Sequence, residues 1–399
     1  MRKLLLFLLS AATVMTLGLT VTQPHTHLVL AQAQERVSEP RELDRFIAAF
    51  ERIRSGYVDQ LDQAQLIDAA IKGMVGMLDS QSSYIDWPHF RDMQISVSHL
   101  VGLGIEFIPE KGYFKVIAPI DDSPAGKAGL KTNDIITQVD GVSVQGFTPD
   151  RLVLDKLIGA VGSQVRLTVL RQGQDKPVEL TLVREMTPFK TVRSRQEGGE
   201  IGYLRIPLMN EWTMPALEKA ISELSSQIPA DKLKGYVLDL RNTPHGPRYV
   251  AVSIADAFLE EGEIVSVKGG NPEQIKHFSA GPGDIINGKP LVVLINGGTA
   301  SGAEIVAGAL QDHKRATVVG VRSFGRGSEQ KIVPLGGRNG ALRLTTGRYV
   351  TPGGSSFDGT GIVPDIEVPG EVPAKQENDR ALTVAFELLR GITAPHQKG

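Results

Sequence analysis

A strand, a sharp turn and a helix follow one another in residues 291–310, and this segment constrains the fold more than any other. Leu291–Ile295 is an unbroken apolar run, which is typical of a strand buried on both faces. Asn296-Gly297-Gly298 predicts a tight turn directly after it. Ser301 then precedes apolar residues at helical spacing, namely Ile305, Val306, Ala309 and Leu310. A buried strand that turns directly into a buried helix indicates a layered α/β fold.

The same alternation of strands and helices extends over residues 187–375. Further strands are predicted at Ile201–Ile206, Gly235–Leu240, Thr317–Val321 and Leu342–Val350. A helix is predicted over Met214–Ile228, with Thr213 as its N-cap. Arg380–Leu389 predicts a last helix, whose single apolar face is expected to dock on the core. The pattern therefore indicates an α/β domain followed by a C-terminal helix and tail over residues 376–399.

Composition excludes several classes of function. The chain has 399 residues, enough for two or three domains, and its 41% hydrophobic and 22% charged residues are typical of a soluble globular protein. A net charge of −2 gives no electrostatic attraction for nucleic acid. The chain has no cysteine, which excludes disulfides and thiolate chemistry, and its scattered histidines include no His-Glu-x-x-His pair. We therefore expect neither a metal nor a cofactor.

Residues 1–33 predict an export signal. Arg2 and Lys3 form a basic start, Leu4–Leu19 an apolar core, and Ala31-Gln32-Ala33 a cleavage site of small residues. An uncleaved membrane anchor is the alternative, but the apolar stretch is shorter than the roughly 20 residues that a spanning helix needs. The basic signal and the absence of cysteine favour the bacterial periplasm. Membrane attachment is expected only through an uncleaved signal.

Residues 42–92 predict a small helical domain without chemistry of its own. Apolar residues form one helical stripe within residues 43–53 and a second within residues 66–78. Residues 56–62 between them predict a loop.

Residues 97–185 combine two glycine-containing stretches with strand-like segments. Val101–Phe107 reads VGLGIEF, and Ser123–Val144 reads SPAGKAGLKTNDIITQVDGVSV. Together with the strand-like segments around them, these stretches resemble a PDZ domain. The resemblance implies that the carboxylate-binding loop consists of Gly102, Leu103, Gly104 and Ile105. Glycines let backbone N–H groups converge on a chain-terminal carboxylate, while the peptide adds as a strand to the sheet edge. The expected partners are C-terminal tails of proteins or peptides.

The block Asn296–Gln330 carries a longer pattern, in which NGGTAS opens a helix and SFGRGSEQ follows that helix. It resembles the active-site segment of the C-terminal processing peptidases, or tail-specific proteases, which are serine endopeptidases with a serine–lysine dyad. The resemblance implies that Ser301 is the nucleophile and that Gln330 orients the dyad. It also implies an α/β core of the ClpP/crotonase type over residues 187–375, with a PDZ domain inserted ahead of it and a helical domain at the N-terminus.

The position of the dyad lysine departs from the family pattern. In the family this lysine follows the serine by 25 residues, and here that residue is Arg326. A desolvated lysine can accept the serine proton near neutral pH. Arginine cannot, because its pKa lies above about 12 and less than about 10⁻⁵ of it is neutral at pH 7. Lys331 is an alternative base, but on an extended strand it points away from the face of Arg326, whereas Gln330 lies beside it.

Residues 239–248 begin at the end of the predicted strand Gly235–Leu240, and they match a second family segment that takes part in the reaction. The family pattern there is Asp-Leu-Arg-x-Asn-Pro-Gly-Gly-Leu-Leu, whose glycine pair lends backbone N–H groups to the oxyanion hole. The resemblance assigns this role to Gly246, and Gly302 at the start of the helix supplies the second donor.

This chain reads DLRNTPHGPR in that segment, with Thr243 for the asparagine and His245 for the first glycine. Pro247 follows the second glycine. A side chain at 245 restricts φ, and Pro247 removes one N–H donor. His245 is also an alternative base near Ser301.

Two functions follow from these patterns. The first is an exported serine endopeptidase that holds C-terminal tails with its PDZ domain and cleaves through Ser301. The second is a catalytically impaired relative that binds peptide tails, or works with an adaptor or an active paralogous protease, without cutting. The family resemblance, the architecture and the intact serine favour the first. Arg326, His245 and Pro247 favour the second, because both sides of the active site depart together.

Overall fold

The computed structural model describes residues 40–96, 103–148, 152–185, 190–271, 275–370 and 378–391. Its contacts divide the chain into two units, Met1–Ile67 and Asp68–Gly399. The predicted export signal and Gly102 of the predicted carboxylate-binding loop lie outside the described residues. Within the described ranges, no helix combines the length and the apolar character that crossing a membrane requires.

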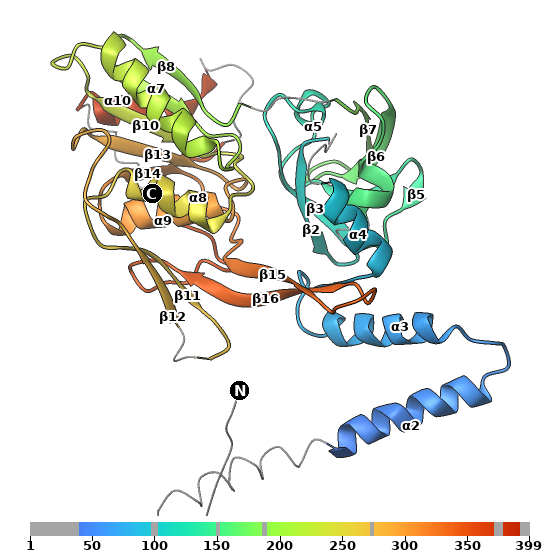
Figure 1. Cartoon of the computed structure of the whole chain (residues 1–399). Helices are drawn as coiled ribbons and strands as arrows, with labels where there is room; N and C mark the ends of the chain where they lie inside the picture. The colour runs from blue at the N-terminus through green and yellow to red at the C-terminus, as the bar shows by residue number, and fades with distance from the viewer. Residues whose placement is uncertain are drawn as a thin grey trace, which may run out of the picture. The chain divides into compact units, whose positions relative to one another are not determined.

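Two helices are observed where the apolar stripes predict them (Figure 1). Helix α2 spans Pro40–Gly56 in the first unit, and helix α3, Gln63–Gly76, begins in that unit and continues into the second. The loop predicted between them is observed. Helix α4, Trp87–Ser96, follows after the short strand β1, Ser83–Ile85.

An antiparallel sheet forms the domain that resembles a PDZ domain. Its strands run in the order β2-β3-β4-β6-β7, with β5 beside β4. The bounds are β2 Ile105–Glu110, β3 Tyr113–Pro119, β4 Ile135–Val139, β5 Val142–Ser143, β6 Gln164–Leu170 and β7 Val178–Val183. The short helices are α5, Pro124–Lys127, and η2, Val153–Leu157. Alternate residues of β3, β4 and β6 point inward, and Phe114, Val116, Ile136 and Leu167 are buried in one hydrophobic core.

A second sheet forms the centre of the α/β domain. Its strands run in the order β17-β14-β13-β10-β9-β8, parallel except for β8. The bounds are β8 Arg193–Glu197, β9 Ile201–Arg205, β10 Gly235–Asp239, β13 Leu291–Ile295, β14 Thr317–Gly320 and β17 Ile366–Glu367. The four strands predicted here are all observed, with ends that agree to about one residue.

Helices cover both faces of this sheet because successive side chains of a buried strand point to opposite faces. Val292 and Leu294 face α10, Arg380–Leu389, in one core cluster. Leu291, Val293 and Ile295 belong to the larger cluster on the other face. That face is covered by α7 Thr213–Gln227, α8 Arg248–Asp256 and α9 Gly302–Asp312.

A third, antiparallel sheet packs beyond α8 and α9 (Figure 1). Its order is β1-β16-β11-β12, with β15 also paired to β16. The bounds are β11 Glu263–Lys268, β12 Ile275–Ser279, β15 Ser328–Pro334 and β16 Ala341–Val350. Of these, the sequence pattern predicts only β16. The others are short or half-exposed and mix polar with apolar residues, so their local pattern does not identify them as strands. Strands β1 and β11 are also placed by pairing with β16, which lies far along the chain.

The predicted cap of α7 is wrong by one residue. The helix begins at Thr213, and Trp212 occupies the N-cap position without a side-chain hydrogen bond. Thr213 instead accepts a hydrogen bond from the backbone N–H of Asn210 at 2.8 Å. Its hydroxyl is therefore used to close the preceding turn.

Candidate active site

The turn after β13 is fixed to the end of the neighbouring strand β10. Asn296 accepts hydrogen bonds from the backbone N–H groups of Asn242 at 2.8 Å and Gly298 at 3.0 Å. Thr299 donates its hydroxyl proton to the carbonyl of Leu240 at 2.9 Å. These hydrogen bonds satisfy polar groups of the tight turn, which would otherwise be buried without partners. They place the next residues, which include Ser301, at the carboxyl edge of the parallel sheet.

Ser301 has a strained backbone. Its φ of 57° and ψ of −117° lie in a region that residues with a side chain seldom occupy, at a cost of about 1–3 kcal/mol. Two bonds hold it there: Glu304 accepts its N–H at 2.9 Å, and the N–H of Ala300 binds the carbonyl of Thr243 at 3.0 Å. Such a sharp strand-to-helix turn presents the serine hydroxyl at the N-terminus of the helix, as in other serine hydrolases.

Gly246 and Gly302 lie against each other beside this turn. The carbonyl oxygen of Gly246 is 2.6 Å from the position that a Cβ atom on Gly302 would occupy, so a side chain at 302 would push the two segments apart. Among the described residues, neither glycine N–H donates to an acceptor within the protein. Gly302 is also the first residue of α9, where backbone N–H groups have no intrahelical partner. Both predicted oxyanion donors are therefore near Ser301 and free.

His245 and Pro247 flank Gly246 without blocking the turn. His245 is exposed, and Pro247 occupies the N-cap position of α8 with a φ of −56°. A proline at a helix start replaces an N–H that has no intrahelical acceptor, so it does not disturb the helix.

Glu304 joins the two halves of the site. Its side chain is fully buried, and its carboxylate accepts four hydrogen bonds. The donors are the N–H of Ser301 at 2.9 Å, the hydroxyl of Ser323 at 2.5 Å, and the N–H groups of Gly325 at 2.6 Å and Arg326 at 2.8 Å. Burial raises the pKa of Glu304 to about 7, although the four donors oppose this. Sequence reasoning missed this residue as part of the site. The Ser-x-x-Glu spacing of a capping box was the available signal.

The side chain of Arg326 pairs with a residue outside the predicted catalytic centre. Its guanidinium Nη1 forms an ion pair with Oε1 of Glu106, on strand β2 of the PDZ domain. The two side chains are only 19% and 29% exposed, so solvent screens the pair incompletely. No hydrogen bond joins Arg326 to Ser301 among the described residues. The hydroxyl of Ser301 therefore has no proton acceptor from this position.

Gln330 makes no hydrogen bond to Arg326 among the described residues. Its Nε2 donates to the hydroxyls of Ser328 at 3.2 Å and Thr345 at 2.7 Å. Its Oε1 is buried and lacks a hydrogen-bond partner within the described residues. The alternation argument for its position assumed a regular strand, but a β-bulge between Glu329 and Gln330 shifts the register. Lys331, the alternative base, is exposed on β15.

The described part of the carboxylate-binding loop has the backbone that such a loop requires. Gly104 has a φ of +69°, and a Cβ there would lie 2.2 Å from the Cβ of Ser123. The carbonyl of Leu103 accepts from Ala125 N–H at 2.9 Å, and that of Gly104 accepts from Ile120 N–H at 2.8 Å. Ile105 begins strand β2, the edge strand of the sheet. An edge strand beside such a loop can accept a peptide as an additional strand.

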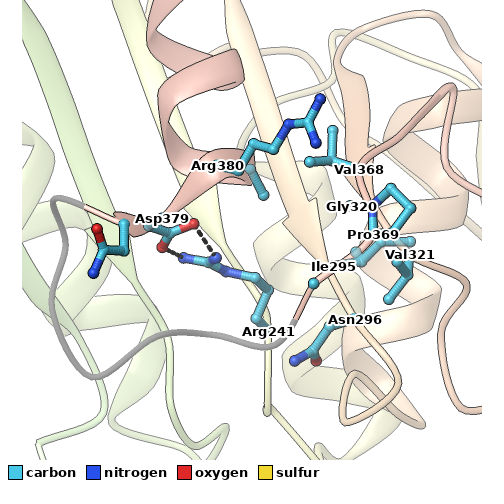
Figure 2. Close-up of a pocket in the computed structure, with 12 residues that line it drawn as sticks. Arg241, Ile295, Asn296, Gly320, Val321, Val368, Pro369, Asp379 and Arg380 are labelled. Atoms are coloured by element: carbon cyan, nitrogen blue, oxygen red, sulfur yellow. Dashed lines mark hydrogen bonds and ion pairs between the residues drawn. The ribbon is translucent and has the colours of Figure 1, made fainter. Parts of the chain in front are cut away.

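A buried ion-pair network lies at the same edge of the parallel sheet. Arg241 pairs with Asp239 at 2.6 Å and with Asp379 at 2.8 Å, and Tyr203 donates to Asp239 at 2.7 Å. Burial opposes the ionisation of Asp239, but Arg241 overcomes it and lowers the pKa of Asp239 to about 2. Figure 2 shows Arg241 and Asp379 meeting beside a small cavity of about 130 Å³. This network joins β10 to the start of α10.

The fold and this site define a serine-type peptidase that carries a PDZ domain. The model of the PDZ domain matches residues 101–182, that of peptidase family S41 residues 200–368, and that of the activating protease CtpB N-terminal domain residues 8–87. The chain therefore belongs to peptidase family S41, and among its members to the carboxy-terminal processing proteases.

Named relatives support this assignment over most of the chain. The carboxy-terminal-processing protease of Bartonella bacilliformis is 46% identical over 376 residues, which cover 93% of this chain and 85% of that protein. The carboxy-terminal processing protease CtpA of Bacillus subtilis is 31% identical, with 92% and 77% covered. The solved structure of a photosystem II D1 C-terminal processing protease matches with a TM-score of 0.71 at 28% identity, covering 83% of this chain and 94% of that one.

Proposed function

We propose that this protein is an exported endopeptidase that holds the C-terminal tails of protein substrates with its PDZ domain and cleaves them with Ser301. The observation that carries the proposal is the strained backbone of Ser301 at the start of α9, where the N–H groups of Gly302 and its neighbour Gly246 donate to no acceptor among the described residues. Strain of this kind persists only where the surrounding structure enforces it, and it gathers at functional sites.

The chemistry assigned to these residues is acyl transfer. The Ser301 Oγ attacks the carbonyl carbon of the scissile bond, and the resulting oxyanion accepts hydrogen bonds from the N–H groups of Gly246 and Gly302. The C–N bond then breaks, the amine leaves with a proton, and water releases the acyl group. Each oxyanion donor of this kind typically contributes about 2.7–4 kcal/mol to the stabilisation of the transition state.

The serine proton is the weak point of this reaction in the present chain. Arg326 cannot accept it, and its guanidinium is engaged by Glu106. A positioned general base typically contributes about 10² to 10⁴ in rate. We therefore propose a slow peptidase, in which water or a distant group takes the proton, rather than one with the usual turnover of a serine–lysine dyad.

A tail-binding protein without turnover is the second candidate, and two contacts favour it. Arg326 has a partner outside the catalytic centre, and Oε1 of Gln330, the oxygen that would orient a lysine, has no hydrogen-bond partner within the described residues. In this role the PDZ domain would hold peptide tails, alone or together with an adaptor or an active paralogue.

Export to the bacterial periplasm is part of the proposal and rests on the signal-like residues 1–33 and on the lack of cysteine. Peptide tails are then the tails of exported proteins.

Cleavage by the chain without its signal, residues 34–399, tests the proposal. An unstructured protein that ends in apolar residues is incubated with this chain and with its Ser301→Ala variant, and products are identified by mass spectrometry. Slow cleavage by the unsubstituted chain alone supports the peptidase. Equal cleavage by both proteins removes Ser301 as the nucleophile. If neither cleaves, binding of the same tail, compared with a tail whose carboxylate is amidated, decides whether the second candidate holds.

A further inference from the structure

Two ion pairs connect the PDZ domain to the two loops beside Ser301. One lies on the side of the oxyanion donors. Asp121, directly after β3 in the PDZ domain, receives hydrogen bonds from Nε of Arg205 at 3.1 Å and from its Nη2 at 3.2 Å. Arg205 ends strand β9 of the catalytic domain and is 8% exposed. A planar guanidinium that grips both carboxylate oxygens gives a stronger and more directional contact than a single exposed pair.

The same guanidinium also contacts residues 239–248, the loop that carries the predicted oxyanion donor Gly246. Nη1 of Arg205 donates to the hydroxyl of Thr243 at 3.1 Å and to the carbonyl of Asp239 at 3.2 Å. The carbonyl of Thr243 accepts the N–H of Ala300 at 3.0 Å, one residue before Ser301. Direct contacts therefore run from a PDZ carboxylate to the nucleophile turn.

The second pair lies on the side of the dyad position. Glu106 on β2 holds the guanidinium of Arg326, whose backbone N–H donates to Glu304 at 2.8 Å. The carboxylate of Glu304 also accepts the N–H of Ser301 at 2.9 Å. A second chain of contacts therefore links the PDZ domain to Ser301, through Arg326 and Glu304.

We propose that the PDZ domain positions both active-site loops, with Asp121 acting through Arg205 and Glu106 acting through Arg326. In this chain Arg326 is then a positioning residue that docks the PDZ domain, and its charge serves the interface instead of the reaction. In both ion pairs the acid comes from the PDZ domain and the arginine from the catalytic domain. A third pair, Asp122 with Arg193 at 2.5 Å, follows the same rule but has a 70% exposed carboxylate. Exposed pairs of this kind contribute little.

Amide hydrogen exchange on the full-length chain tests the proposal, because it reports the order of each loop and requires no turnover. Asp121→Asn and Glu106→Gln remove one carboxylate charge each and keep the shape of the side chain. Asp122→Asn and Glu185→Gln are the matched controls. Asp122 lies next to Asp121 in a largely exposed pair, and Glu185 pairs with Lys127 within the PDZ domain.

The two variants are expected to affect different loops. Asp121→Asn should make amides in residues 239–248 exchange roughly tenfold faster and leave residues 322–328 unchanged. Glu106→Gln should do the reverse, and the controls should alter neither loop. The proposal is overturned if both loops exchange as in the unsubstituted chain, or if each control has the same effect as its partner.

The amides of β3 and β6 serve as the internal reference for folding. If Asp121→Asn also speeds exchange there, the PDZ domain itself has lost stability. Asp121→Glu then replaces it, since this variant keeps the charge and displaces the carboxylate by one methylene. Faster exchange confined to residues 239–248 supports the proposal, and unchanged exchange there contradicts it. Cleavage by Ser301 is irrelevant to every outcome, so failure here is distinct from failure of the proposed function.

Discussion

The carboxylate of Glu304 accepts a hydrogen bond from the backbone N–H of Ser301 at 2.9 Å and, through the same oxygen, one from the N–H of Arg326 at 2.8 Å. A single buried side chain therefore sets the distance between the nucleophile turn and the loop that carries the dyad position. Since both loops depend on it, Glu304 should influence both stability and geometry.

Replacing Glu304 should change how stability depends on pH. The folded pKa, about 7, lies above the ordinary value of 4.5, so the native state holds the proton more tightly than the unfolded chain does. The contribution of Glu304 to the free energy of unfolding is therefore full below pH 4.5 and is lost as the pH rises through 7, by an amount on the order of 3 kcal/mol. Glu304→Gln should lack this pH-dependent component. Urea unfolding of both proteins below pH 4.5 and above pH 7 measures it.

The same substitution should also destabilise the protein at low pH. An amide nitrogen at 304 would face two N–H donors, and unsatisfied buried groups of this kind cost about 1–3 kcal/mol each. Glu218→Gln, on the exposed face of α7, is the control and should behave like the unsubstituted chain. A pH-dependent difference of the same size in both variants would contradict the assignment.

Arg326→Lys should increase peptidase activity. The amine of lysine is titratable and can accept the serine proton. In the unsubstituted chain the buried Oε1 of Gln330 lacks a hydrogen-bond partner within the described residues, so it can accept a hydrogen bond from this amine. We expect kcat/KM to rise about 10² to 10⁴-fold, the usual contribution of general-base catalysis. The variant that also carries Ser301→Ala should show no gain. If Arg326→Lys alone gives none, either the oxyanion side is impaired or another group serves as the base.

Gly104→Ala should weaken the binding of C-terminal peptides. Alanine tolerates a φ of +69° poorly, and its Cβ would lie 2.2 Å from the Cβ of Ser123, so the loop must move. We expect the affinity for a peptide with a free C-terminus to fall by roughly tenfold or more. Gly112→Ala is a matched control, because Gly112 also has positive φ, +84°, but no neighbouring atom within 4 Å of its Cβ position. Fluorescence anisotropy with a labelled tail compares them. Equal losses would indicate that general strain, and not the loop, is responsible.

Asp379→Asn should weaken the attachment of α10. Asparagine can still accept the N–H of Leu382 and cap the helix. It carries no negative charge, however, so the buried charge of Arg241 loses one of its counterions. Removing one partner of a buried ion pair lowers the free energy of unfolding by up to about 3–5 kcal/mol. The loss should be smaller here because Asp239 still pairs with Arg241. Urea unfolding should show the loss.

Glu200→Gln provides the comparison for Asp379→Asn, because it breaks the other ion pair between α10 and the sheet, Arg390 with Glu200 at 2.7 Å. That pair is 37% and 29% exposed and should change stability by no more than about 1 kcal/mol. Similar effects of the two variants would show that the buried network has no special role.

Much of the fold follows from local pattern. The apolar run Leu291–Ile295, the turn after it and the helix that Ser301 precedes predict a layered α/β fold, and the structure has a mostly parallel sheet with helices on both faces. The third sheet is not predictable in this way, since β1 and β11 both pair with β16, which lies far along the chain.

The sequence by itself determined the family, and it predicted the position of the nucleophile and the residue at the dyad position. All three are carried by residue type and spacing within one short segment, and an arginine there excludes proton abstraction because of its pKa alone. Where that arginine goes was decided only by tertiary structure. Its partner Glu106 lies 220 positions away, on another domain, and Asp121 and Arg205 are 84 positions apart. Such contacts depend on how separately folded elements meet, and no local pattern encodes them.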